Sequence, residues 1–382
     1  MSSSRSSRQS SGWARPLRLL LRLILMGVGL GVITGSLLKL AGPAVQRGDL
    51  TLPPWLTQPG SPPTAETGAA SQAQPPQRAK RSASLGLFQT KNELKALSER
   101  WKQLAAGEPD LTVSAFMLVL DDGRYAQLSP DTALPAASAI KTPILLVTLE
   151  ELDAGKLSWN EPLTLTKPVV GGGAGWMASK PLGTRFPTHE VATEMIRVSD
   201  NTATNLLIER LGGKDALNAR FNTLGLSATA VNNWLPDLKG TNTTSARDLA
   251  RSIALVDTGE ALSIRSRDLF REVMGTSVTN TLLPKGLLRG LGGQQGAPDD
   301  SLMIKGYRVL NKTGDIGIAY ADAGLIELPD GSRAVAAFLV KGPFNDPRST
   351  ELIRKLAAAM APVLKPKPAV ARNTAAAASI NP

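Results

Sequence analysis

The 382-residue sequence predicts an α+β fold, in which an antiparallel sheet built from both chain ends is flanked by helices and accompanied by an all-helical subdomain. Short apolar runs bounded by turn residues occur on both sides of a long helical middle at about 188–274. These strand-like runs are 112–120, 124–128, 307–313, 317–327 and 333–341. Because helical spacing precedes the first run and follows the last, helices are expected to cover the sheet.

The remaining elements follow from local patterns. A helix is predicted over 88–106, where apolar residues recur at helical spacing. An Asp-Asp-Gly turn at 121–123 joins the first two strands, and a strongly apolar helix is predicted over 138–154. A Pro-Asp-Gly-Ser turn at 329–332 joins the last two strands, and a closing helix spans about 347–363.

The content of cysteine and histidine limits the chemistry. The chain has no cysteine, which excludes disulfides, thiolate zinc sites, iron–sulfur clusters and a cysteine nucleophile. It has one histidine, His189, which excludes sites built from several histidines. His189 stands at a predicted helix start and is interpreted as a surface residue. We therefore expect neither a metal nor another cofactor.

The net charge of +11 lies outside the globular region. Residues 1–81 carry ten basic and two acidic residues, and residues 365–382 carry three basic residues and no acidic one. Residues 82–364 hold 30 basic and 30 acidic residues and are neutral overall. The positive charge therefore does not indicate a nucleic-acid partner.

The N-terminal charge and hydropathy predict membrane attachment. Residues 1–16 form a basic tail, expected in the cytoplasm, and the apolar segment 17–41 is predicted to be a single-pass transmembrane signal anchor in the inner membrane. A cleaved signal peptide is the alternative. A Pro-rich linker, 42–81, leads to the globular domain at 82–363, on the periplasmic side. The tail at 364–382 is expected to be disordered.

Ser138 and Lys141 lie three residues apart at the start of the apolar helix, so the hydroxyl and the amine share one helix face. The helix N-terminus favours a developing oxyanion. A neutral lysine beside a serine is a general base that needs no histidine. The alternative is a helix-capping serine and a solvated lysine. A second match, Ser36 and Lys39, shows that this pattern alone is weak.

Two further motifs carry chemistry. A Ser-Asp-Asn triplet at 199–201 stands between two predicted helices, where Asp and Asn are also ordinary capping residues. A Lys-Thr-Gly triplet at 312–314 ends one predicted strand and begins the next, and a glycine there lets a ligand backbone approach closely. Trp176, in a Gly-rich loop, either walls a pocket or is a packed aromatic residue.

The order SxxK, SDN, KTG is more specific than any single motif. This set is typical of class A β-lactamases and penicillin-binding proteins. Residues 87–363 resemble the class A β-lactamase-like serine hydrolases, and the Asn-Thr-Ala-Thr-Asn stretch at 201–205 strengthens the resemblance. The resemblance implies the β-lactamase/DD-peptidase-like fold.

The resemblance also implies catalytic roles at the matching positions. Ser138 is the expected acylated nucleophile and Lys141 its base. Ser199 is expected to relay a proton to the leaving nitrogen, helped electrostatically by Lys312.

Four residues are expected to bind the substrate. Asn201 would bind a side-chain amide of the substrate, and Thr313 its carboxylate, beside Gly314. The backbone N–H of Asp315 would complete an oxyanion hole with that of Ser138.

The sequence departs from the resembled family in the omega loop. Class A β-lactamases carry there, in a Trp-Glu-Pro-Glu-Leu-Asn type run, a Glu that activates the deacylating water. The corresponding run is 234–239, in which Leu235 replaces that Glu and Lys239 replaces an Asn. Asp237 is the nearest carboxylate and a doubtful substitute. We therefore expect fast acylation of Ser138 and slow deacylation.

Three functions remain open. The favoured one is a membrane-anchored serine hydrolase that opens the ring amide of a β-lactam. The second is a penicillin-binding peptidase acting on D-Ala-D-Ala stems of peptidoglycan. The third is a non-catalytic binder or sensor of cell-wall fragments, against which the complete motif set argues. The expected partners are a β-lactam or stem peptide and, through 17–41, the inner membrane. The sequence leaves the oligomeric state open, and a monomer is the expectation.

Overall fold

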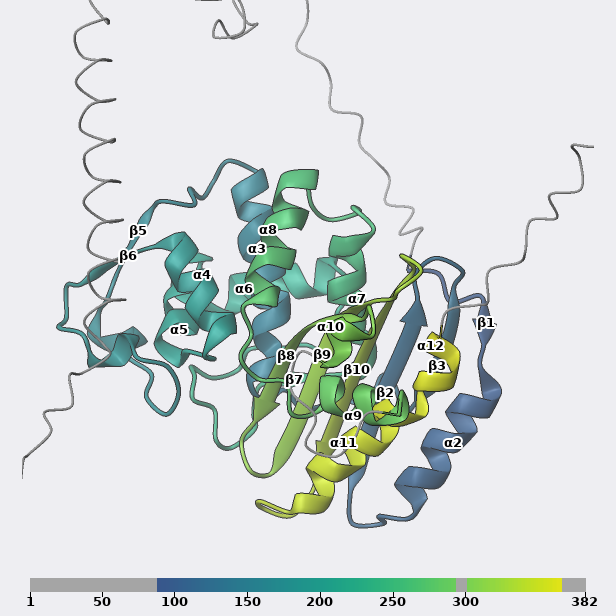
Figure 1. Ribbon diagram of the computed structural model, residues 1–382. Helices are drawn as coiled ribbons and strands as arrows, with labels where there is room; N and C mark the ends of the chain where they lie inside the picture. The colour runs from purple at the N-terminus through teal and green to yellow at the C-terminus, as the bar shows by residue number, and fades with distance from the viewer. Residues whose placement is uncertain (1–87, 293–300, 366–382) are drawn as a thin grey trace, which may run out of the picture. The chain divides into compact units, whose positions relative to one another are not determined.

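The computed structural model describes residues 88–292 and 301–365 (Figure 1). Across these two stretches, no helix is both long and apolar enough to cross a membrane. Several predicted segments lie outside the described residues, namely 1–16, 17–41, 42–81 and nearly all of 364–382.

A six-stranded sheet with the order β1-β3-β2-β10-β9-β8 forms the centre of the domain. Its strands are β1 (Asn92–Glu93), β2 (Thr112–Val119), β3 (Arg124–Leu128), β8 (Arg308–Asp315), β9 (Ala319–Glu327) and β10 (Arg333–Lys341). Strand β2 pairs antiparallel with β10, with Ala115 opposite Phe338, so the sheet joins both halves of the sequence as predicted. The short strand β1 pairs parallel with β3, which makes the sheet mixed rather than purely antiparallel.

One face of the sheet is covered by helices from both ends of the domain, in front of the sheet in Figure 1. They are α2 (Lys95–Ala106), α9 (Leu283–Gly290), α10 (Ser301–Ile304), α11 (Pro347–Ala359) and α12 (Ala361–Leu364). Side chains alternate along β2, so Ala115 and Met117 pack into this core. The Trp101 Nε1 donates a 2.9 Å hydrogen bond to the Leu356 carbonyl and ties α2 to α11.

The opposite face packs against the helical subdomain, to which β2 contributes Phe116 and Leu118. The helices are α3 (Lys141–Asp153), α4 (Thr188–Arg197), α5 (Asn201–Arg210), α6 (Gly213–Thr223), α7 (Ala246–Asp257) and α8 (Ile264–Gly275). Every residue of α3 from 141 to 149 is buried, which explains its almost continuous apolar sequence. Two small sheets, β4 (Leu134–Pro135) with β7 (Thr243–Thr244) and β5 (Pro162–Thr164) with β6 (Arg185–Pro187), complete this part.

The predicted start of the first helix is wrong. The helix begins at Lys95, because the backbone before it bonds to a neighbouring strand instead. The Lys91 N–H donates to the Gly123 carbonyl at 2.8 Å, and the Leu94 N–H donates to the Tyr125 carbonyl at 2.7 Å. These contacts between distant residues override the helical spacing.

Three smaller boundaries also differ. Ser138 lies in a 3-10 turn, η2 (Ala137–Ile140), and the α-helix begins only at Lys141. The Lys-Thr-Gly triplet lies inside β8, which continues to Asp315. The closing helix is interrupted at Met360, and α12 follows with a proline in its first turn.

Candidate active site

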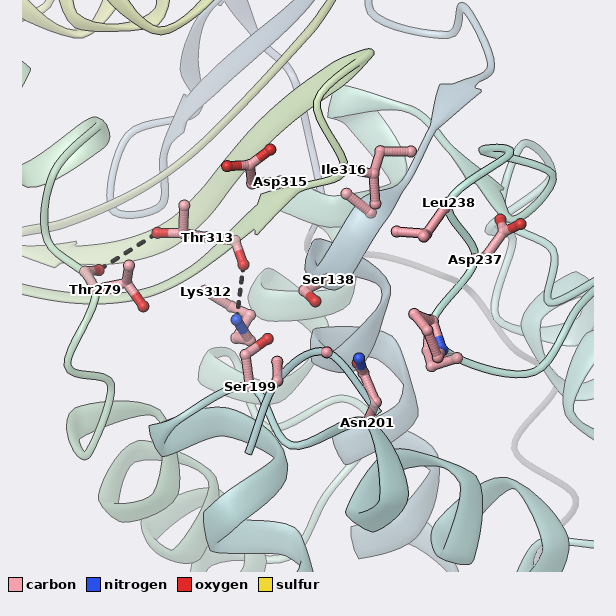
Figure 2. A pocket seen from close by; sticks show the side chains of 15 residues that line it. Ser138, Ser199, Asn201, Asp237, Leu238, Thr279, Lys312, Thr313, Asp315 and Ile316 are labelled. Atoms are coloured by element: carbon pink, nitrogen blue, oxygen red, sulfur yellow. Dashed lines mark hydrogen bonds between the residues drawn. The ribbon is translucent and has the colours of Figure 1, made fainter. Parts of the chain in front are cut away.

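A pocket of about 270 Å³ opens between the end of β8 and the helical subdomain (Figure 2). It collects residues from η2, the Gly-rich loop, the loop between α4 and α5, the segment after α6, and β8. The lining residues are Ala137, Ser138, Gly173, Ala174, Ser199, Asn201, Leu235, Pro236, Asp237, Leu238, Thr279, Lys312, Thr313, Asp315 and Ile316.

Ser138 is held at the centre of this pocket by a tight turn. Ala137 has a φ of +47°, a left-handed backbone that an L-residue adopts only where the surroundings impose it. Strand β8 lies directly against the turn, since a Cβ on Gly314 would come within 2.8 Å of the amide nitrogens of Ser138 and Ala139. Gly314 therefore makes room for the protein's own backbone and does not line the pocket.

Lys141 is completely buried one turn beyond Ser138. Its Nζ donates to the Ser199 carbonyl at 2.7 Å, to Ser199 Oγ at 3.0 Å and to Asn201 Oδ1 at 2.9 Å. Burial, and then repulsion by Lys312, hold the pKa of Lys141 well below its ordinary value, and Asp200 opposes this only in part. Three donated bonds would use all the protons of an ammonium, whereas the lowered pKa favours the neutral amine, to which the Ser199 hydroxyl would instead donate. The complete burial rules out the alternative of a solvated lysine.

The loop between α4 and α5 presents Ser199 and Asn201 to Lys141. Ser199 has a φ of +62°, which turns its hydroxyl into the pocket. Asp200 caps α5, as its residue type suggested, by accepting the Ala203 N–H at 2.9 Å. The other oxygen of Asp200 accepts the backbone N–H groups of Trp176 and Met177 and so fixes the Gly-rich loop.

Lys312 is the second buried lysine. It donates a 2.7 Å hydrogen bond to the Thr313 carbonyl (Figure 2) and lines the same pocket as Ser199 and Ser138. Burial lowers the pKa of Lys312 to about 8, while the charge of Asp322 acts in the opposite direction. At neutral pH the protonated form therefore dominates, and this side of the pocket is positive.

Thr313 and Thr279 form the wall of the pocket next to Lys312. The Thr313 hydroxyl donates to the Thr279 carbonyl at 3.3 Å (Figure 2). Thr313 is nearly buried but still reaches the cavity. If the single proton of the Thr313 hydroxyl turns from the Thr279 carbonyl to a ligand, this hydroxyl and the Lys312 ammonium together suit a carboxylate.

The opposite wall is the segment that contains Leu235. Asn205 of α5 binds both backbone groups of Leu235, accepting its N–H at 2.9 Å and donating to its carbonyl at 2.8 Å. Pro236, Leu238 and Ile316 add apolar surface to the lining. The position at which a general base was expected therefore presents a hydrocarbon side chain.

Asp237 lines the pocket, but both of its oxygens are engaged elsewhere. Oδ1 accepts the Thr241 hydroxyl at 3.0 Å, and Oδ2 accepts the Asn242 N–H at 2.6 Å. In Figure 2 the carboxylate points away from Ser138. The Asp237 carboxylate thus stabilises its own loop through these two hydrogen bonds.

The structure brings most of the predicted site residues to one cavity. Ser138, Ser199, Asn201, Lys312, Thr313 and Asp315 line it, and Lys141 lies beneath them. Trp176 lies outside the lining; its ring packs edge-on against Phe186, and its Nε1 donates to Glu194 at 2.7 Å. His189 is exposed at the start of α4 and bonds to the Trp159 carbonyl.

Sequence reasoning missed two residues that shape the site. Asn205 was visible as the last residue of the Asn-Thr-Ala-Thr-Asn stretch, but its bonds to Leu235 could not be read from the sequence. Thr279 contributes through its backbone carbonyl, which leaves no signal in residue type. Within 88–292 and 301–365, no group of three or more His, Asp or Glu residues could hold a metal ion.

Comparison with known proteins agrees with this geometry. Residues 95–364 match the model of the beta-lactamase enzyme family. The extended-spectrum beta-lactamase PER-1 of Pseudomonas aeruginosa is 26% identical over 285 residues, covering 71% of this chain and 87% of the relative. A beta-lactamase of Streptomyces cellulosae is 26% identical over 272 residues, covering 68% and 82%.

Solved structures give the same result. PBP-A is 42% identical with a TM-score of 0.66, covering 72% of this chain and 97% of PBP-A. A leucine-to-glutamate mutant of PBP-A, in an acyl-enzyme complex with penicillin G, is 41% identical with a TM-score of 0.66 and coverages of 72% and 98%. An ancestral class A beta-lactamase, 24% identical with a TM-score of 0.60 over 70% and 99% of the two chains, shares the fold. From the matched family model and the shared fold, this chain belongs to the beta-lactamase enzyme family.

Proposed function

We propose that the protein is a serine hydrolase that is acylated by a β-lactam at Ser138 and releases the acyl group slowly. The observation that carries the proposal is the placement of Lys141. Its amine is buried, favours the neutral form and lies 3.0 Å from Ser199 Oγ, one turn from the Ser138 hydroxyl. A neutral amine in this place can remove the serine proton without a histidine.

The proposed acylation uses only groups of the pocket. The Ser138 Oγ forms a bond to the ring carbonyl carbon while its proton passes to Lys141 Nζ. The carbon–nitrogen bond then breaks, and the Ser199 hydroxyl protonates the leaving nitrogen while Lys141 returns a proton to Ser199. The N–H groups of Ser138 and Asp315 would stabilise the oxyanion, a contribution of about 3 kcal/mol per donor.

The substrate would be oriented from two sides. Lys312 and Thr313 would bind its carboxylate, and Asn201 would bind the side-chain amide. Gly314 would act indirectly, because its missing side chain lets β8 lie against the amide of Ser138.

Slow deacylation follows from the wall opposite these residues. Leu235 cannot accept a proton from water, and the Asp237 carboxylate is bound to Thr241 and Asn242. The acyl-enzyme complex of the PBP-A mutant with penicillin G supports the formation of a covalent adduct with a β-lactam in this fold.

Mass spectrometry of the intact protein after mixing with benzylpenicillin tests the proposal. The expected result is an increase by the mass of one intact drug molecule, which persists for many times the acylation half-time. Ser138→Ala is the control and should show no adduct. Rapid loss of the drug without an accumulating adduct would contradict slow deacylation, and no reaction at all would contradict acylation.

A second function is favoured by the similarity to PBP-A, which is 42% identical to this chain. The same residues would then attack a D-Ala-D-Ala peptide bond of peptidoglycan. Release of D-alanine from a synthetic stem peptide, measured beside hydrolysis of a chromogenic cephalosporin, distinguishes the two substrates.

We further propose that residues 17–41 hold the domain on the outer side of the inner membrane. The basic residues at 1–16 and the apolar character of 17–41 support this orientation. Membrane fractionation of cells that express the full chain, with protease added to spheroplasts, tests it. A full-length protein in the soluble fraction would contradict the anchor, and a shortened one would indicate cleavage.

A further inference from the structure

We propose that Asp322 and Asn311 are positioning residues that hold Thr313 and Thr279 in place to bind a substrate carboxylate. This inference rests on the proposed binding of a carboxylate-bearing substrate at Lys312 and Thr313. It concerns a buried polar cluster on the far side of β8, which the acylation chemistry does not use.

Asp322 is a completely buried carboxylate on β9, opposite Thr313 in the strand register. It accepts hydrogen bonds from Asn311 Nδ2 at 2.9 Å and from the backbone N–H of Leu283 at 2.9 Å. The second bond is to the first residue of α9. Burying a carboxylate is unfavourable unless its oxygens are bonded, so the cluster has a defined geometry.

Asn311 carries the connection from Asp322 to the pocket. Its Nδ2 also donates to the Thr279 carbonyl at 2.9 Å and lies 3.3 Å from the Thr313 hydroxyl. The same Thr279 carbonyl accepts the Thr313 hydroxyl. One carboxylate therefore fixes an amide that contacts both threonines of the pocket wall.

The cluster also acts on the neighbouring lysine. Asp322 stands on the strand next to Lys312, and its charge favours the protonated form of that amine. Loss of Asp322 would thus weaken carboxylate binding in two ways. Asn311, which donates to the Thr279 carbonyl, would lose its partner, and Lys312 would lose the negative charge that favours its protonated form. Both effects weaken the binding of ligands with a carboxylate, and neither removes Ser138, Lys141 or Ser199.

The experiment compares benzylpenicillin with its methyl ester, which lacks the carboxylate. Binding is measured calorimetrically on the full chain with Ser138→Ala, so that no acylation is needed, and acylation rates are measured with Ser138 present. We expect Asp322→Asn to reduce the preference for the acid over the ester by about tenfold, because the amide replaces one acceptor oxygen with an NH2 group that would face the donor Asn311 Nδ2 or the Leu283 N–H. Asn311→Ala should cause a similar loss and serves as the second variant if Asp322→Asn fails to fold.

The matched control is Asp257→Asn, which removes another buried carboxylate, one that binds Arg271 and Arg333 away from the pocket. It should lower stability without changing the preference. An unchanged preference in a folded Asp322 or Asn311 variant overturns the proposal, as does an equal loss in the control or no preference in the parent protein. If the parent binds the acid selectively but is never acylated, the proposed function fails and the positioning role stands.

Discussion

Lys141 and Lys312 are both buried, but their surroundings prepare them for different tasks. Repulsion from Lys312 adds to the effect of burial on Lys141 and favours its neutral form. The Lys312 ammonium is partly stabilised by Asp322, and its pKa of about 8 keeps it protonated at neutral pH. Burial thus favours loss of the proton from Lys141 beneath the pocket, while Lys312 in the lining keeps its positive charge at neutral pH.

This difference predicts the basic limb of the pH profile for acylation. As the pH rises through about 8, Lys312 loses its proton, and the pocket loses its charge for the substrate carboxylate. The second-order rate constant for acylation by benzylpenicillin should therefore fall above about pH 8. In Lys312→Arg the fall should move to higher pH, because a guanidinium stays protonated. An unmoved limb in that variant would assign the titration to another group.

Substitution of Leu235 gives a direct test of the proposed slow deacylation. Leu235→Glu places a carboxylate on the wall of the pocket where the general base is missing. We expect the acyl-enzyme to be hydrolysed about 100 times faster, at the lower end of the usual range for a general base, because Lys239 still replaces the Asn of the resembled family. Stopped-flow or mass-spectrometric decay of the adduct measures this. Leu235→Gln is the control of equal size, and equal decay of the two variants would refute the explanation.

Gly314 predicts a purely steric effect. A methyl group at this position would lie 2.8 Å from the backbone nitrogens of Ser138 and Ala139, so the turn or the strand must move. Gly314→Ala should lower the acylation rate about 100-fold, since a displacement near 1 Å has this effect on reacting groups. Gly107→Ala, with its nearest neighbour at 3.5 Å, is the control. A fully active Gly314→Ala would show that the contact is unimportant.

At the scale of elements, the segment between α6 and α7 is held by two asparagines that act alike. Asn205 binds both backbone groups of Leu235, and Asn218 binds both backbone groups of Val231. Each asparagine side chain thus satisfies one backbone N–H and one backbone carbonyl in an otherwise irregular stretch of chain. Leu235, which Asn205 binds, lines the pocket, whereas Val231, which Asn218 binds, does not.

Alanine substitutions of Asn205 and Asn218 should therefore affect acylation differently. Asn205→Ala should lower the free energy of unfolding by about 1–3 kcal/mol and also slow acylation, because the released Leu235 segment lines the cavity. Asn218→Ala should cost a similar amount of stability with little change in acylation. Thermal unfolding and amide hydrogen exchange at 230–240 measure both. If Asn205→Ala left amide hydrogen exchange at Leu235 unchanged, the bonds from Asn205 would not be what holds this segment in place.

The same elements show how far the sequence could predict the structure. Nearly continuous apolar runs located α3, which follows Ser138, and the hairpin of β9 and β10 after Lys312, because these elements are buried almost throughout. Periodicity failed at Asn92–Glu93, where the backbone pairs with a strand more than twenty residues further along the chain. The motifs predicted which side chains meet, whereas the support from Asp322 depends on strand register, which no local pattern encodes.

At the scale of the whole domain, helices from both ends of the sequence share one face of the sheet. Trp101 of α2 joins them, since it is completely buried, packs edge-on against Phe338 and bonds to the Leu356 carbonyl of α11. The pocket that holds the candidate active site lies on the other side of the sheet, against the helical subdomain. The sheet therefore separates the contact of Trp101 with α11 from the candidate active site.

Trp101→Phe tests this separation. The substitution keeps an aromatic ring but leaves the Leu356 carbonyl without its donor, so the free energy of unfolding should fall by about 1–3 kcal/mol. The acylation rate at 25 °C should remain unchanged. Denaturant unfolding and adduct formation on the same sample give both numbers. A large loss of acylation at unchanged stability would mean that the two sides of the sheet are coupled.

The pairing of β2 with β10 has a consequence for the order of events during synthesis. Strand β2 lies near the start of the domain, and its partner β10 is among the last elements to be made. The central sheet cannot close until almost the whole chain is available, which is a slow step in folding because a long loop must be ordered first. Until then the apolar edge of β2 is unpaired and open to aggregation. A chain ending before Arg333 should therefore remain unfolded, although every catalytic motif is already present in it.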